Sequence, residues 1–159
     1  MMKALTIWQP WASLIIAGAK PYEFRGWLPP SSLIGRRIAI HAGARKPKVT
    51  EVDDLIERLK HGVGHDNPCL RREEALELLT RARKQMHLMP LSAVIGTATL
   101  GKPKRGDVCA EEMGLGKAGN DSDREGTFNW GWPMLDVKPC LPPMPAKGMQ
   151  GLWNFGGDL

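Results

Sequence analysis

The most informative stretch of the chain spans residues 8–27 and reads WQPWASLIIAGAKPYEFRGW. It gathers three tryptophans, an amide and three charged side chains. Pro10 suits the first turn of a short helix over residues 11–17, and Gly18 is a typical residue to end it. Residues 22–25 alternate as a strand does, which places Glu23 and Arg25 on one face and the two aromatic residues on the other. The stretch therefore predicts a helix followed by a strand with a charged face.

The rest of the chain predicts several short strands and two further helices. Strand patterns cover residues 4–7, 37–42, 92–100, 130–137 and 151–155, with a proline-rich bend before the last, and helical spacing covers residues 50–59 and 71–87. Thr50 with Asp53 resembles a capping pair. Residues 101–127 are polar and glycine-rich, so they predict a flexible loop. Without regular strand–helix alternation, we expect an α+β domain over residues 1–159 whose strands form a small barrel with about three surrounding helices.

Composition limits the class of protein. The 159 residues fit one domain, and 22 basic against 17 acidic residues give a net charge of +5, which permits an anionic partner. Three distant cysteines signal neither a disulfide framework nor a zinc cage, so a reducing cytoplasm fits, and no apolar run is long enough for a membrane span. His61, His65 and Cys69 have helical spacing, but glycines and a proline interrupt it. We expect no metal and no cofactor.

Lys20, Glu23 and Arg25 form the sharpest candidate site, although an exposed strand edge carries such charge pairs without any function. In the functional interpretation, Arg25 is a planar fork for a phosphate or a base edge, Lys20 is a point cation, and Glu23 orients either one or takes a proton. Trp8, Trp11 and Trp27 are either core residues or stacking platforms for a base, Trp11 and Trp27 being the chosen candidates.

Other candidates surround this set. Gln9 either reads a base edge or caps the helix, the cap being the commoner role. Arg45, Lys46 and Lys48 form a basic cluster that could hold a nucleic-acid backbone. His41 lies on the opposite strand face from Ile38 and Ile40, where a histidine is either a hydrogen-bonded structural residue or a general base.

Several of these motifs together resemble a known family. Residues 9–14 (Gln-Pro-Trp-Ala-Ser-Leu), the pattern Gly18-x-Lys20-x-x-Glu23-x-Arg25-x-Trp27, residues 38–42 and 45–47, and Lys147-Gly148 with Trp153 resemble the ASCH domain of the PUA-like superfamily, from about Lys3 to Phe155. The resemblance implies a small β-barrel with helices around it and a cleft whose floor carries Lys20, Glu23 and Arg25. It also implies binding of RNA or another nucleic acid, and in some relatives cleavage of RNA or hydrolysis of a modified cytidine.

One branch of the family uses a threonine nucleophile three residues after the motif lysine. In this chain that position is Glu23, and residue 21 is a proline. Because a carboxylate cannot act as the same activated hydroxyl, the resemblance does not carry that deacylation mechanism over.

Three functions stay open at this point. The first is an RNA-binding module that takes single strands, a nucleotide or a modified nucleoside. The second is a hydrolase acting on RNA or a modified nucleoside, with Lys20 stabilising negative charge and Glu23 or His41 moving protons. The third is a coactivator-like module that docks a protein partner through residues 101–127.

Overall fold

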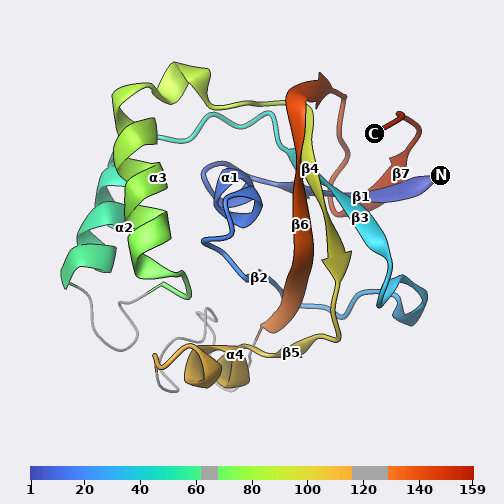
Figure 1. Cartoon of the computed structure of the whole chain (residues 1–159), viewed down its shortest axis with the longest axis horizontal. Coiled ribbons are helices and arrows are strands. Elements are labelled where there is room, and N and C mark those ends of the chain that lie inside the picture. The colour runs from blue at the N-terminus through green and yellow to red at the C-terminus, as the bar shows by residue number, and fades with distance from the viewer. Residues whose placement is uncertain (62–67, 116–128) are drawn as a thin grey trace.

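The computed structural model describes residues 1–61, 68–115 and 129–159. Its strands form one sheet, curled into a half-barrel, with helices beside it (Figure 1). The strand order is β2-β6-β4-β3-β1-β7, and the short β5 also pairs with β6. The strands are β1 (Met2–Ile7), β2 (Tyr22–Arg25), β3 (Arg37–Ala42), β4 (Ala93–Leu100), β5 (Lys104–Arg105), β6 (Trp130–Pro145) and β7 (Leu152–Phe155).

Strands β1 and β3 run parallel to each other, and the other strand pairs are antiparallel. The register sets Thr6 beside His41, while Ala4 lies beside Ala39 on one side and Trp153 on the other. The pairing of β3 with β4 shifts between Ile40 and His41. Thr6, His41 and Trp153 therefore come from three neighbouring strands.

Alternation along these strands separates two apolar layers. Leu5, Ile7, Ile38 and Ile40 pack on one face together with the fully buried Trp132. Ala4, Ala39, Val94, Trp153 and Phe155 pack on the other face. His41 shares that second face, opposite Ile38 and Ile40 as predicted, because alternation continues through β3.

Four α-helices lie in the described part of the chain: α1 (Trp11–Ile16), α2 (Val49–His61), α3 (Arg72–Lys84) and α4 (Gly106–Glu112). Helix α1 lies between the sheet and the α2–α3 pair (Figure 1). Leu14 of α1 joins the apolar residues of α2 and α3 in one cluster, while Ala12 and Ile15 join the core of the sheet. Gly18 adopts the positive φ of 78° that a helix stop requires. Helix α1 therefore ties the sheet to the helical pair.

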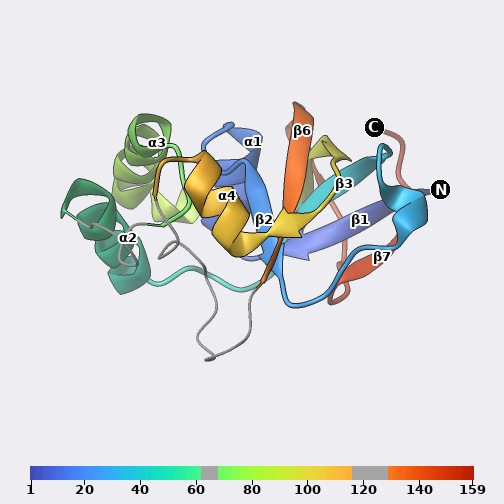
Figure 2. The same ribbon diagram turned by 90° about the horizontal axis from the view of Figure 1, so that it is seen from below.

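The predicted α+β class is confirmed, but two predicted segments are wrong. The proline-rich bend lies instead within β6, because beyond Met134 this strand has β4 as its neighbour and its other side is an edge that tolerates proline. The loop predicted over residues 101–127 contains β5 and α4, a helix of 7 residues that the sequence signals only through Cys109 and Ala110. Residues 116–127 of that loop lie outside the described residues. Figure 1 shows α4 below the sheet and next to β5, and Figure 2 shows it beside β2.

Candidate functional site

A cavity of about 840 Å³ opens beside the ends of β1, β2 and β3. Its walls come from these strands, from residues 43–45 after β3 and from residues 147–151 before β7. Arg25, Arg45 and Lys147 bring three positive charges to the lining, against one carboxylate from Glu23. The cavity therefore carries an excess of positive charge.

Glu23 is the centre of a buried ion network on the cavity floor. Its Oε1 accepts the backbone N–H of Phe24 at 3.1 Å and lies 3.5 Å from Nζ of Lys20. Its Oε2 lies 3.3 Å from Nη2 of Arg25. Glu23 and Arg25 share one strand face, as alternation predicts. Both carboxylate oxygens are engaged, so the two cations and the backbone fix this side chain.

Lys20 lies behind Glu23 and does not line the cavity. It is only 5% exposed, and its ammonium donates to the carbonyl of Tyr22 at 2.7 Å. The same ammonium lies 5.0 Å from the ring centre of Phe24 and 5.5 Å from that of Trp11. Lys20 therefore acts on Glu23 and on the aromatic floor, while a ligand in the cavity has no direct access to it.

Arg25 connects this network to the central strands. Its Nη2 donates to the carbonyl of Thr6 at 2.9 Å. Within the described residues, the hydrogen bonds and ion pairs of its guanidinium all use Nη2. Nη1 and Nε of Arg25 are therefore the donors that can meet an anion in the cavity.

Trp8 and Arg45 form the rim of the cavity. The indole of Trp8 is 59% exposed, and the guanidinium carbon of Arg45 lies 4.6 Å from its ring centre. Arg45 also binds Glu51 of α2 through both terminal nitrogens. Hydrogen bonds from Arg45 and from the Lys48 N–H lower the pKa of Glu51 to about 2. The Lys48 contact is the reciprocal bond of a helix start, so Glu51 takes the capping role that the sequence assigned to Thr50 and Asp53.

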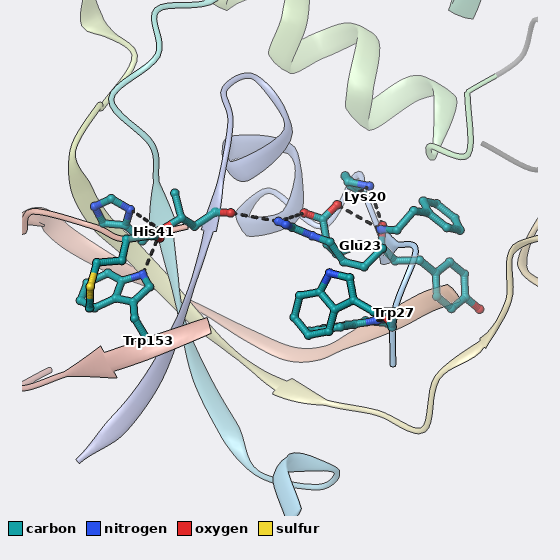
Figure 3. Close-up of polar contacts among 11 residues, drawn as sticks. Lys20, Glu23, Trp27, His41 and Trp153 are labelled. Carbon is teal, nitrogen blue, oxygen red and sulfur yellow. Dashed lines mark hydrogen bonds and ion pairs between the residues drawn. The ribbon is translucent and has the colours of Figure 1, made fainter. Parts of the chain in front are cut away.

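His41 lies at the other end of the floor and is 1% exposed. Its Nε2 contacts the carbonyl oxygen of Ala146 at 2.8 Å, and its Nδ1 contacts Oγ1 of Thr6 at 3.2 Å. The ring of Trp153 meets the imidazole edge to face, with 5.3 Å between ring centres. Figure 3 shows the polar contacts running from Lys20 and Glu23 at one end to His41 and Trp153 at the other.

The structure brings part of the predicted set together. The predicted residues that line the cavity are Trp11, Glu23, Arg25, His41 and Arg45. Lys20, Gln9, Trp27, Lys46 and Lys48 do not line it. Lys46 and Lys48 are exposed beyond Arg45, and Trp27 packs edge-on against Trp132 with 4.7 Å between ring centres.

The side chain of Gln9 caps helix α1 and does not face the cavity as a group that could recognise a base edge. Its Oε1 accepts the N–H of Ser13 in the first turn of α1 at 3.0 Å. Its Nε2 donates to the Ser13 hydroxyl and to the carbonyl of Pro90. Because Gln9 is 1% exposed and its amide is fully engaged, it has no free group for a base edge.

The candidate residues predicted from the sequence left out two features of the cavity. Trp8 is the exposed tryptophan at the rim, although the sequence favoured Trp11 and Trp27. Lys147 and the backbone of residues 148–151 form a wall of the cavity. Trp8 precedes the helix that contains Trp11, and this position outside the helix was the available signal. For the wall formed by residues 147–151, the motif Lys147-Gly148 was the only indication in the sequence.

The comparison with family models identifies an ASCH domain in this chain. The chain belongs to this family, whose model matches residues 5–85. The ASCH protein of Zymomonas mobilis has a similar crystal structure, with a TM-score of 0.50 and 20% identity over 98% of this chain and 88% of that one. Crystal structures of two mutants of that protein, a serine-to-alanine and a tyrosine-to-phenylalanine substitution, match with the same TM-score and identity, covering 98% of this chain and 89% and 91% of those chains. Among curated proteins, no match was found.

Two observations relate to the predictions of no membrane span and no metal site, and both cover the described residues alone. No helix within residues 1–61, 68–115 and 129–159 has the length and apolar character needed to cross a membrane. In the same residues, no group of three histidine, cysteine, aspartate or glutamate side chains is arranged to hold a metal ion. His65, one member of the spaced set with His61 and Cys69, lies outside the described residues.

Proposed function

We propose that this chain binds single-stranded nucleic acid, with RNA as the expected form, in the cavity between Trp8 and Lys147. The observation that carries the proposal is the Trp8–Arg45 pair at the rim, an exposed indole with a guanidinium 4.6 Å from its ring centre. Exposed aromatic rings beside cations are the usual platform for unpaired bases. The family membership supports the same class of ligand.

The charges of the cavity suit a phosphate backbone. Within the described residues, Nε and Nη1 of Arg25 have no partner and can donate to a phosphate, and Lys147 adds a second cation, whereas Arg45 already pairs with Glu51. A base stacked on Trp8 would lie at the rim of the same cavity that Arg25 and Lys147 line. Glu23 has the indirect role of holding Arg25 in place, since Nη2 of Arg25 contacts both Glu23 and the Thr6 carbonyl.

Fluorescence anisotropy with a labelled single-stranded RNA tests the proposal. Removing the Trp8 ring in Trp8→Ala is expected to weaken binding by about fivefold to 150-fold, because one base–aromatic stack is worth about 1–3 kcal/mol. Trp8→Phe is expected to keep part of the affinity. Leu141→Ala is the control, because Leu141 is 82% exposed on β6 and does not line the cavity. Absence of RNA binding at low salt, or equal loss in Trp8→Ala and Leu141→Ala, would contradict the proposal.

Hydrolysis of RNA or of a modified nucleoside has less support from this geometry. A general base needs a lone pair that faces the substrate. Both carboxylate oxygens of Glu23 and both ring nitrogens of His41 already have protein partners, and Lys20 lies behind Glu23. Incubation with RNA and with acylated nucleosides, beside Lys20→Ala, tests this alternative. Turnover that depends on Lys20 would favour it over simple binding.

A further inference from the structure

Trp27 carries an exposed ring near the cavity. This residue is 42% exposed, and the next residue, Leu28, is 51% exposed. Neither residue lines the cavity. Single exposed apolar side chains are common on protein surfaces and do not by themselves mark a binding site. The position of the Trp27 ring relative to the cavity therefore decides what the ring can do.

Strand register places the Trp27 ring on the sheet face that carries the charged floor of the cavity. Glu23 of β2 lies directly opposite Trp132 of β6, and Arg25 lies opposite Trp130. Residues directly opposite each other on antiparallel strands point their side chains to the same face. The ring of Trp27 packs against that of Trp132, with 4.7 Å between ring centres and the two planes at 88°. Trp27 therefore lies on the same face as Glu23 and Arg25, both of which line the cavity (Figure 3).

Trp27 also lies beside the wall of the cavity. A Cβ built on Gly151 would lie 4.0 Å from Cζ2 of Trp27, so the ring is close to the backbone at this position. Gly151 itself lines the cavity, and its carbonyl accepts the N–H of Thr6 at 3.3 Å. Strand β1 therefore holds this part of the wall, and the Trp27 ring begins where the lining of the cavity ends.

Two contacts with Trp132 hold Trp27 in place and leave its ring able to stack. Nε1–H of Trp132 donates to the backbone carbonyl of Trp27 at 3.2 Å, so the main chain is held at this residue. The edge-to-face contact between the two rings uses at most one face of the Trp27 indole. Trp132 is fully buried, whereas Trp27 reaches solvent. An exposed ring that is already held in position loses little conformational entropy when a base stacks on it.

Cations on the cavity side of Trp27 suit the phosphates of a nucleic-acid strand. Arg25 shares the sheet face of Trp27, and within the described residues its Nε and Nη1 have no partner. Lys147 lies in the same wall as Gly151. Proteins bind single strands by combining positive charge along the backbone with aromatic rings on which successive bases stack. The cavity and the Trp27 ring together have both features.

We propose that Trp27 is a second stacking platform, on which a further base of a bound strand rests where the strand leaves the cavity over Gly151. This inference rests on the proposed nucleic-acid binding function and names its ligand class, an oligonucleotide rather than a free nucleotide. A mononucleotide occupies the cavity alone and does not reach Trp27. Affinity therefore depends on the Trp27 ring only for ligands longer than one nucleotide.

Fluorescence anisotropy with a labelled short oligouridylate tests the second platform. Trp27→Leu keeps an apolar side chain beside Trp132 but removes the ring, so it is expected to weaken binding by at least about fivefold, the effect of one lost base–aromatic stack. Trp27→Phe is expected to lose less. Leu28→Ala is the matched control and is expected to keep full affinity, because Leu28 is the exposed neighbour and does not line the cavity. Uridine monophosphate is expected to bind Trp27→Leu and the unmodified protein equally.

The indole N–H signal of Trp27 tests the same contact by NMR in the unmodified protein, where no substitution affects folding. Trp27→Phe assigns the signal. Saturating oligouridylate is expected to shift it, whereas uridine monophosphate is expected to leave it unchanged. RNA binding that depends on Trp8 but leaves the Trp27 signal in place, or keeps its affinity in Trp27→Leu, would overturn the second platform and leave the proposed function intact. Absence of RNA binding by the unmodified protein would contradict both proposals.

Discussion

Glu23 is the residue on which the site depends. Its carboxylate lies between Lys20 and Arg25 and accepts a backbone N–H as well, all in a nearly dry environment. A buried ion pair of this kind contributes little net stability, but removing one partner leaves the other charge buried and unpaired. The network therefore fixes the position of Arg25 more than it stabilises the fold.

Glu23→Gln tests this role at the residue scale. It is expected to lower the free energy of unfolding by about 3 kcal/mol, because Lys20 and Arg25 lose their counter-charge. Urea denaturation measures the change, and Glu77→Gln is the matched control, since Glu77 pairs with Arg81 on an exposed helix face and should change stability by less than about 0.5 kcal/mol. Similar effects of the two substitutions would show that Glu23 is not the centre of the network.

The sequence correctly predicted that Glu23 and Arg25 share a strand face, but it did not predict how deeply the residues around them are buried. Alternation alone placed Glu23 and Arg25 on one face, which the 3.3 Å ion pair confirms. The burial of Lys20 and Gln9 could not be predicted, because it depends on Pro90 and on the rings of Trp11 and Phe24 packing around them. Local patterns carry the direction of a side chain, whereas burial depends on contacts distant in sequence.

At the scale of elements, the start of α2 positions the rim of the cavity. Glu51 in its first turn holds both Arg45 and the Lys48 N–H, so the helix start fixes the guanidinium that lies on Trp8. The segment between β3 and α2 is therefore held at both of its ends, by the sheet and by the helix.

Acidification is expected to break the contacts that Glu51 makes with Arg45 and with the Lys48 N–H. The folded protein lowers the pKa of Glu51 from 4.5 to about 2, so its contribution to stability is present above pH 4.5 and is lost as the pH falls toward 2. Glu51→Gln should therefore be less stable than the unmodified protein at pH 5, with the difference shrinking near pH 2. Denaturation at both pH values checks this. Glu73→Gln, exposed in the first turn of α3, should differ little from the unmodified protein at either pH, and a constant deficit in Glu51→Gln would contradict the account.

Element prediction succeeded where periodicity was long and failed where it was short. The 13-residue helices α2 and α3 repeat their apolar residues over several turns, and the sequence located both. Helix α4 has two turns and few apolar residues, and the prolines of β6 hid a strand whose edge tolerates them. Such segments take their structure from their neighbours in the sheet.

At the scale of the whole molecule, the curled sheet gathers the site from both ends of the chain. Trp8 and Arg25 come from the N-terminal part, and residues 147–151 come from just before the last strand, which pairs with β1. This pairing across the sheet explains why the motif at residues 8–27 pointed to the right region but described only part of the cavity. The remaining wall depends on a contact between residues more than a hundred positions apart.

The indole N–H signals of the six tryptophans provide the most direct measurement of the central claim that the cavity binds single-stranded RNA through Trp8. In an NMR titration with a short single-stranded RNA, we expect a saturable shift of the Trp8 signal, a smaller shift of Trp11 in the cavity lining, and an unchanged signal from the fully buried Trp132. Trp8→Phe assigns the first signal. RNA binding that leaves the Trp8 signal in place would contradict the claim.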